Sequence, residues 1–254
     1  MMTTTFSCPK LVCSLIFLHP RHLMLLSNGF VHKKLMNNIK PKLFSGEQSE
    51  IYTILSNYLN FWHTEASHEK WDKIRRVYAI HCLNHILKAQ EQVLKNNKIV
   101  KRYENKKELP PRLEDQGFAR PRILILQPYR NSAYKLIKTM ITLLGLEVMK
   151  KKEFEHYYGP PEDEADSNKN KPEDFQKIFA GNIDDDFRIG VALSRNALKL
   201  STPLSKSDII IASPLCLRRL LEEEKGKKSD DDEKRPKVVD VLSSIEIFII
   251  DQGE

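Results

Sequence analysis

The sequence predicts an α/β fold in which a buried parallel sheet follows a helical segment. Three observations lead to this prediction. Apolar runs of strand length recur after residue 120, helical periodicity separates them, and helical periodicity alone marks the region before them. The chain has 254 residues, 41% of them hydrophobic and 30% charged, which is enough for one sizeable core.

Residues 1–43 are expected to form a poorly ordered leader. Their apolar run, Leu11–Leu18, has the length of a signal-peptide core, but only Lys10 precedes it and no small-residue cleavage site follows. The run is also much shorter than the roughly 20 apolar residues that cross a bilayer. We therefore expect no membrane partner, and a targeting segment is the alternative interpretation.

Residues 44–114 are expected to contain two helices and a linker. Apolar residues recur at helical spacing from Gln48 to Asn96, with a break near Glu65–Glu69. Between Asn96 and Arg120 charged residues dominate, and Pro110-Pro111 prevents regular structure. We therefore expect a connector there.

Residues 115–254 are expected to form one incomplete α/β domain. Four apolar runs have the composition of strands that are covered on both faces of a parallel sheet. The predicted strands are Arg122–Gln127, Phe187–Leu193, Asp208–Ala212 and Ile245–Ile250, and the predicted helices are Ser132–Leu144 and Pro214–Glu224. Two polar stretches, 157–174 and 222–237, are expected to be mobile surface insertions.

An acidic motif follows the last predicted strand. Asp251, Gln252 and Glu254 stand where motif II of nucleotide-hydrolysing helicases has its acidic residues. In an active ATPase, one carboxylate of that motif holds Mg²⁺ and a second orients the attacking water. Asp251 has the first position, but Gln252 has the second, and an amide cannot act as a general base. We therefore interpret the motif as degenerate, and a simple loop or helix-cap role for Asp251 is the alternative.

A phosphate-binding loop is missing from the sequence. No G-x-x-x-x-G-K followed by Ser or Thr occurs, and Gly226-Lys227 lies in a charged stretch rather than between a strand and a helix. We therefore expect no nucleotide cofactor, no small-molecule substrate and no catalytic residue.

Two strand-to-helix turns supply the candidate RNA-binding residues. The turns Gln127–Ala133 and Ala212–Arg218 resemble motifs Ia and Ib of DEAD-box RNA helicases, where amides and cations face RNA phosphates. The candidates are Arg130, Asn131, Ser213, Arg218 and Arg219. A net charge of +7 also favours a polyanionic partner. The order of the three motifs, each at the carboxyl end of a buried strand, predicts a RecA-like, or P-loop NTPase-like, domain.

No metal site is expected from the cysteines and histidines. Cys8, Cys13, Cys82 and Cys216 lack CxxC spacing, which indicates reduced thiols. His81 and His85 are four residues apart and would share a helix face, but no third ligand is evident. We therefore expect these histidines to serve helix packing or a partner contact.

Four further segments carry a resemblance to a known family. They are Asn84-His85, Asp115–Pro121, Ser207–Pro214 and Ile250–Gln252. With the motifs above, they make the chain from about Phe44 to Glu254 resemble the U3 small nucleolar RNA-associated protein 25 family, also called digestive organ expansion factor. The resemblance implies a helicase-like fold without ATP motifs and residence in the nucleus and nucleolus. It also implies a non-catalytic role in the small-subunit processome, in pre-rRNA processing toward 18S rRNA, with pre-rRNA, U3 small nucleolar RNA and processome proteins as partners.

Two other classes of function compete with this reading of the sequence. One is an ATP-dependent RNA helicase fragment whose ATP-binding motif is missing or unusual, and the other is a protein-interaction domain that uses the fold as a platform. Nucleotide binding would distinguish the helicase fragment from the RNA-binding scaffold. Salt-dependent RNA binding would distinguish the scaffold from the protein-interaction domain. Members of the family usually carry a long acidic amino-terminal region and a second RecA-like domain, so the chain is expected to be a fragment.

Overall fold

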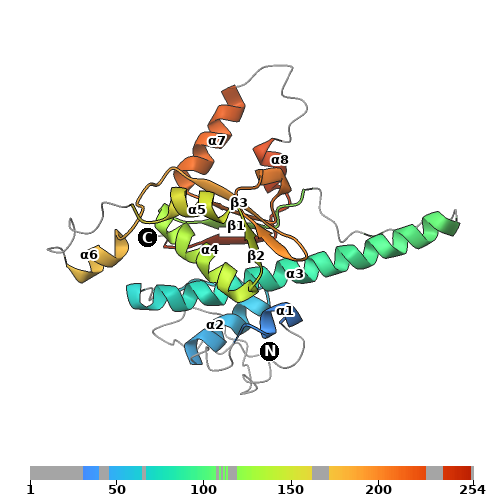
Figure 1. The fold of residues 1–254 in the computed structure, drawn as a ribbon, viewed down its shortest axis with the longest axis horizontal. Coiled ribbons are helices and arrows are strands. Elements are labelled where there is room, and N and C mark those ends of the chain that lie inside the picture. Colours follow the sequence, from blue (N-terminus) through green and yellow to red (C-terminus); the bar gives the residue numbers. More distant parts are fainter. Residues whose placement is uncertain are drawn as a thin grey trace, which may run out of the picture.

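Helices cover both faces of a six-stranded sheet in the computed structural model of the protein (Figure 1). The structure describes residues 31–39, 46–64, 67–106, 109, 111, 113, 119–161, 172–226 and 237–252. The strands are β1 (Ile123–Leu126), β2 (Glu147–Met149), β3 (Arg188–Leu193), β4 (Ala197–Lys199), β5 (Ile209–Ala212) and β6 (Ile247–Ile250). The helices are α1 (Lys33–Met36), α2 (Gly46–Ser56), α3 (His68–Lys106), α4 (Arg130–Leu144), α5 (Lys151–Tyr158), α6 (Glu173–Ile178), η3 (Leu204–Lys206), α7 (Pro214–Gly226) and α8 (Val238–Leu242). The predicted α/β class is confirmed.

The central strands of the sheet end together at one edge. The strand order is β2-β4-β3-β5-β1-β6. β1 pairs in parallel with both β5 and β6, and Leu126 at its end lies opposite Ala212 and Ile250. The segments that follow these three strands are therefore brought close together.

Strand β3 runs antiparallel, whereas the sequence predicts a parallel strand. It pairs antiparallel with both β4 and β5, and in the described sheet it is the one strand that opposes the others. A tight turn joins it to β4, in which the Ser194 amide donates to the Ala197 carbonyl oxygen at 2.9 Å. A parallel neighbour would need a crossover of a dozen or more residues. Strands β2 and β4 have 3 residues each, too few to give a periodic pattern in the sequence.

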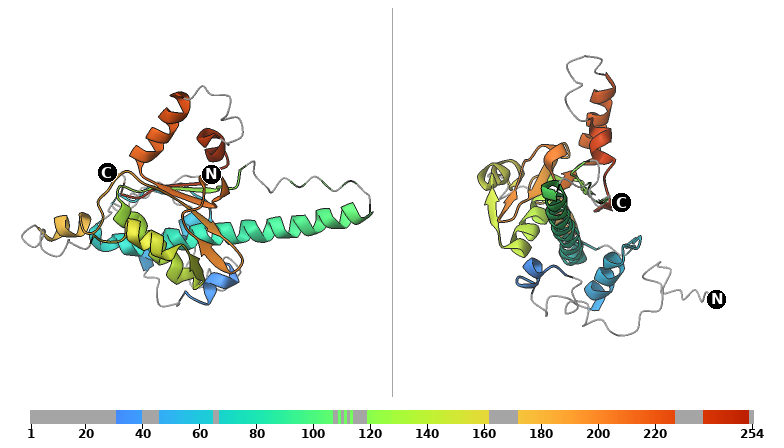
Figure 2. Two further views of the ribbon diagram at one scale, coloured as in Figure 1. Left: turned by 45° about the horizontal axis from the view of Figure 1, so that its top comes forward. Right: turned by 90° about the vertical axis from the view of Figure 1, so that its right-hand side faces the viewer.

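Apolar side chains of the central strands alternate between two cores. Ile123 and Ile125 of β1 belong to the larger core, which they share with α3 and α4. Leu124 between them faces the opposite side, in a smaller core with Val241 of α8. Figure 2 shows α7 and α8 on one side of the sheet and α3 and α4 on the other. The continuous apolar run of β1 thus reflects burial of both faces.

Helix α4 follows β1 and packs one apolar face on the sheet. Leu136, Ile137 and Met140 have no exposed surface. Gly145 ends the helix with a φ of 60°, and its amide donates to the Ile141 carbonyl oxygen. The helix predicted from Ser132 is confirmed and begins two residues earlier, at Arg130.

Helix α3 is longer than the sequence predicts. Its first half crosses the larger core, where Val77, Ile80 and Leu83 are fully buried. The connector predicted from Asn96 is wrong at its start, because the helix continues to Lys106. Lys, Arg and Glu are good helix formers, so a charged stretch without Pro or Gly can extend a helix. The second half of α3 projects past the sheet in Figures 1 and 2.

Residues 31–39 belong to the fold, although the sequence places them in the leader 1–43. Leu35 of α1 is fully buried in the larger core, and Val31 and Ile39, each four residues away, are buried with it. The Asn84 side chain of α3 accepts a hydrogen bond from the His32 amide at 2.8 Å. Residues 1–30 and 40–43 of the predicted leader lie outside the described residues.

The two predicted insertions begin with helical residues. Tyr158 ends α5, is 8% exposed and stacks on Phe154, so the second residue of the stretch 157–174 belongs to the core. In the stretch 222–237, α7 continues to Gly226. Residues 162–171 and 227–236 lie outside the described residues. Within the part of the chain that the structure describes, no helix has the length and apolar character needed to cross a membrane.

Candidate functional site

The degenerate motif II lies at the sheet edge where β1, β5 and β6 end. Asp251 follows β6, and its Oδ2 accepts hydrogen bonds from the Tyr78 hydroxyl at 2.7 Å and from the Gln127 amide at 3.0 Å. Tyr78 comes from α3, and Gln127 directly follows β1. Three elements that are distant in the sequence therefore meet at one carboxylate.

Burial keeps the Tyr78 phenol protonated. Desolvation raises the pKa of Tyr78 well above its ordinary value, and the adjacent Asp251 carboxylate raises it further. The phenol therefore acts as a hydrogen-bond donor to Asp251. Gln127, which is 1% exposed, supplies a second neutral donor. The arrangement anchors α3 to the edge of the sheet and satisfies the Asp251 Oδ2 atom within the protein.

Gln252 is directed toward the start of α4. Its backbone has a φ of 59°, and its Oε1 accepts a hydrogen bond from the Ser132 hydroxyl at 3.1 Å. An amide at this position donates and accepts hydrogen bonds but cannot take a proton from water. Glu254, the third residue of the predicted motif, lies outside the described residues.

Arg130 and Arg219 lie beside two aspartates that precede β3. The Nη2 of Arg130 is 3.0 Å from the Asp184 carboxylate and donates to the Asp186 carbonyl oxygen at 3.1 Å. The guanidinium also lies 5.7 Å from the centre of the Tyr158 ring. Arg219 forms an ion pair with the Asp186 carboxylate. A phosphate that bound here would have to replace Asp184 at Arg130 or Asp186 at Arg219.

Arg218 is the most exposed of the candidate arginines. Its side chain is 78% exposed and pairs with Glu222, one helical turn later, at 2.8 Å. An exposed pair of this type contributes little stability, so the guanidinium can readily exchange its partner.

Asn131 and Ser213 have local structural partners. The Asn131 side-chain amide donates to the Ala180 carbonyl oxygen. Ser213 is 1% exposed, and its hydroxyl accepts a hydrogen bond from the Cys216 amide at 3.0 Å, which caps α7. Asn131 is therefore half-buried beside Arg130, and Ser213 is buried at the start of α7.

Sequence reasoning missed the contact of Tyr78 with Asp251, and it missed Asp184 and Asp186. The run Asp184–Asp186 directly before a predicted strand was a usable signal, because carboxylates near predicted cations indicate ion pairs. Tyr78 gave no signal of this kind. It is separated from Asp251 by 173 residues, and only the packing of α3 brings the two together.

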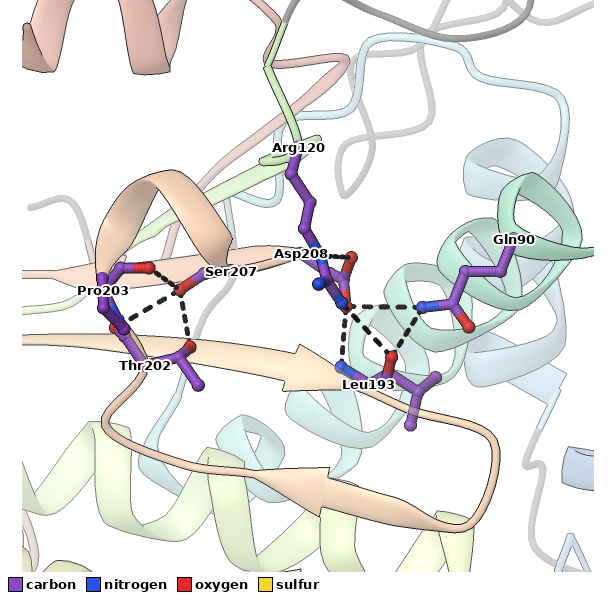
Figure 3. A network of polar contacts seen from close by, with 7 residues as sticks. All are labelled: Gln90, Arg120, Leu193, Thr202, Pro203, Ser207 and Asp208. Carbon is purple, nitrogen blue, oxygen red and sulfur yellow. Dashed lines mark hydrogen bonds and ion pairs between the residues drawn. The ribbon is translucent and has the colours of Figure 1, made fainter. Parts of the chain in front are cut away.

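A second polar network lies at the opposite end of β5 (Figure 3). The buried Asp208 carboxylate accepts hydrogen bonds from the Arg120 Nε at 2.8 Å and from the Leu193 amide at 2.7 Å. Gln90 of α3 donates to the Leu193 carbonyl oxygen at 2.8 Å. The network joins α3, β3, β5 and the segment before β1, so its role is to hold these elements together.

His81 and His85 of α3 contact Tyr58, just after α2. The Tyr58 hydroxyl is 2.7 Å from the Nδ1 of His85, and the Glu246 carboxylate is 2.6 Å from its Nε2. The His81 ring meets the Tyr58 ring edge-on with 5.2 Å between centroids. Both nitrogens of His85 thus have protein partners. The described residues contain no group of three or more His, Cys, Asp or Glu side chains placed to hold a metal ion.

The fold and the site together define a P-loop NTPase-like domain. Its features are the parallel strands that end at one edge, the turn into α4 after β1, and the acidic motif after β6. The family model described as "UTP25, NTP hydrolase-like domain" matches residues 58–254. The chain belongs to the UTP25 family.

Relatives of the chain come from vertebrates and fungi. It is 38% identical over 226 residues to the U3 small nucleolar RNA-associated protein 25 homolog of Xenopus tropicalis, and this match covers 85% of the chain. It is 39% identical over 218 residues to the homolog of Homo sapiens, and this match covers 83% of the chain. The U3 small nucleolar RNA-associated protein 25 of Debaryomyces hansenii is 38% identical over 189 residues, which cover 72% of the chain. The chain spans 28% of the length of the first two relatives and 25% of the third. No solved structure matches it with significance.

Proposed function

We propose that the chain is part of a non-catalytic, RNA-binding scaffold of the small-subunit processome, which acts in the nucleolus in pre-rRNA processing toward 18S rRNA. The observation that carries this proposal is the engagement of the motif II carboxylate by Tyr78 and Gln127. In an active ATPase of this fold, that carboxylate holds Mg²⁺. Here two neutral protein donors bind it, and it fixes a helix to the sheet.

Two features of the sequence support the non-catalytic part of the proposal. Gln252 stands where the water-orienting carboxylate of an ATPase belongs, and no phosphate-binding loop is present in the sequence. The fold without these groups supplies a platform at the carboxyl edge of its strands.

The RNA-binding part rests on charge and on the relatives. The chain carries a net charge of +7, which favours polyanions. The printed names of the relatives associate them with U3 small nucleolar RNA. Partners of the whole protein would then be pre-rRNA, U3 small nucleolar RNA and processome proteins. Arg218 is the candidate contact with the freest side chain, and Arg130, Asn131 and Arg219 would contact phosphates by exchanging their present partners.

Titration calorimetry with Mg²⁺ and ATP tests the non-catalytic assignment. We expect no saturable binding at ATP concentrations up to about 1 mM. A Kd of about 1 mM would correspond to a binding free energy of only about −4 kcal/mol. The matched variants are Asp251→Asn, which keeps an oxygen for Tyr78 but removes the charge, and Asp185→Asn at an exposed position. Phosphate release in the presence of RNA should stay at the level of a protein-free control.

Saturable ATP binding that Asp251→Asn abolishes and Asp185→Asn preserves would establish the helicase alternative instead. A second readout uses cells depleted of the protein, which should accumulate uncleaved precursor and lose small-subunit RNA. The full-length protein with Gln252→Ala should rescue them as well as the unchanged protein. Failure of this rescue at normal protein level would give Gln252 a chemical role and overturn the scaffold assignment.

A further inference from the structure

The second half of α3 carries a concentrated positive charge. Residues 95–106 contain five cations and one carboxylate, Glu104. Lys95, Lys98, Arg102 and Lys106, here called the α3 stripe, follow one another at intervals of three, four and four residues. At 3.6 residues per turn these intervals place them within about 80° of one another around the helix axis. All four side chains are exposed.

The α3 stripe is the outward face of this half of the helix. Val100 lies on the opposite side of the helix and Tyr103 about 100° around the axis from the centre of the stripe, and both are half-buried. The stripe extends along about 17 Å of helix at 1.5 Å per residue. Figures 1 and 2 show that this part of α3 projects beyond the sheet and its other helices. A large ligand can therefore reach the stripe without displacing another described element.

The charges of the α3 stripe are largely unneutralised. Lys95 lies 3.5 Å from Glu91 in an exposed pair, an interaction that contributes well under 1 kcal/mol. Lys98, Arg102 and Lys106 have no carboxylate partner among the described residues. The arginines at the sheet edge differ in this respect, because Arg130 and Arg219 already pair with aspartates.

We propose that the α3 stripe is a docking surface for the phosphate backbone of RNA. This assignment deepens the proposed function and rests on it. A nucleic-acid strand carries a charge about every 3.4 Å along a duplex, so the stripe extends past roughly five phosphates. Cations suffice for contacts of this kind, which position a nucleic acid without reading its sequence. The core of a protein–protein interface is instead apolar and poor in charged residues, so RNA fits the stripe better than a protein partner does.

Removal of the stripe's charge from the whole chain is the direct test. Lys95, Lys98, Arg102 and Lys106 are replaced together by Gln, which is neutral and a good helix former. The matched control replaces four exposed lysines elsewhere, Lys33, Lys152, Lys199 and Lys206, by Gln and so removes the same net charge. Binding of a fluorescent RNA hairpin is measured by anisotropy between about 50 and 200 mM salt.

The stripe variant should bind the hairpin at least tenfold more weakly than the unchanged chain at 100 mM salt. The slope of log K against log salt should fall by about three units, since each lost phosphate contact removes about 0.7 to 0.9. The control variant should stay within about threefold of the unchanged chain. Far-ultraviolet circular dichroism and the thermal midpoint should match in all three proteins, because every substituted side chain is exposed.

Lysine acetylation of the unchanged chain gives a readout that does not depend on substitution. RNA should protect Lys95, Lys98 and Lys106 from acetylation and leave Lys33 and Lys199 reactive. Equal RNA affinity of the stripe and control variants, or equal protection of all these lysines, would overturn the stripe assignment and leave the proposed function standing. Absence of salt-dependent RNA binding by the unchanged chain would instead overturn the proposed function. Displacement of the RNA by polyglutamate at equal charge would assign the stripe to acidic protein segments.

Discussion

His81 makes the stability of the protein depend on pH. Burial lowers the pKa of His81 to about 4, and the charges of His85 and Lys88 act in the same direction. Between pH 6.5 and 4 the unfolded chain therefore binds more protons than the folded protein, and stability falls as the pH falls. We expect His81 to contribute about 2 kcal/mol to the loss of unfolding free energy between pH 7.5 and 5.0.

Urea unfolding at the two pH values measures this contribution. His81→Gln should reduce the pH dependence by about 2 kcal/mol, whereas His156→Gln, at an exposed position on α5, should leave it unchanged. Burial also lowers the pKa values of His32 and His85. In His81→Gln these two residues should therefore leave a smaller dependence of the unfolding free energy on pH, with the same sign. A full pH dependence in His81→Gln would show that the ring is protonated in the folded protein.

Single residues of the candidate site were predictable only where local sequence defines their position. Asp251 and Gln252 follow a recognisable strand, so their place at the sheet edge could be predicted. Their hydrogen-bond partners could not, because Tyr78 and Ser132 reach them through tertiary packing. The roles proposed for the arginines at this edge stay predictions.

Gly190 allows β3 to pack closely against the segment that leads into β5. A Cβ at this position would meet the Ser207 hydroxyl and the Thr202 carbonyl oxygen well inside van der Waals contact. Figure 3 shows that Ser207 and Thr202 are themselves held by hydrogen bonds, and the carbonyl belongs to the backbone, so neither can move easily. Gly190→Ala should therefore destabilise the protein by about 3 kcal/mol.

Chemical unfolding of this variant has a matched control in Gly46→Ala. No atom of the described residues lies within 4 Å of a Cβ built at Gly46, which begins α2. The control should change the unfolding free energy by no more than about 0.5 kcal/mol. Equal stabilities of the two variants would mean that the chain around Ser207 shifts without cost.

Elements were predictable where burial leaves a regular pattern. Strands β1, β3, β5 and β6 appear in the sequence as continuous apolar runs. Strands β2 and β4 leave no such run, because each is short and β2 lies at the sheet edge with two exposed side chains. The direction of β3 depends on the tight turn after Leu193, which the apolar pattern does not encode. The sequence does not define the end of α3, because a charged stretch without Pro or Gly is compatible with a helix as well as with a connector.

Among the described residues, the sheet exposes apolar side chains at the edge formed by β6. β6 is an edge strand, and its Phe248 and Ile250 side chains are 55% and 59% exposed. An exposed apolar edge strand favours association between copies. We expect self-association of the 254-residue chain to increase with its concentration, and Phe248→Ser with Ile250→Thr to shift it toward the monomer in sedimentation velocity.

Two exposed apolar residues away from this edge provide the control. Trp62 and Leu94 are 75% and 51% exposed, and Trp62→Ser with Leu94→Ser removes comparable apolar surface without touching β6. This control should self-associate like the unchanged chain. The proposed role of β6 in self-association would be ruled out if the unchanged chain were monomeric, or if the two double variants dissociated equally.

The two attachments of α3 determine how the helix can meet a ligand. Tyr78 fixes the helix to Asp251 at one end of the sheet, and Gln90 fixes it to Leu193 at the other. No Gly or Pro interrupts α3, so its projecting half continues from a fixed base in a fixed direction. If RNA binds there as proposed, the entropic cost of orienting that half is incurred when the chain folds and not on binding. Two RNA segments held by the helix and by the sheet edge would each raise the effective concentration of the other, so the protein would act as a rigid spacer between them.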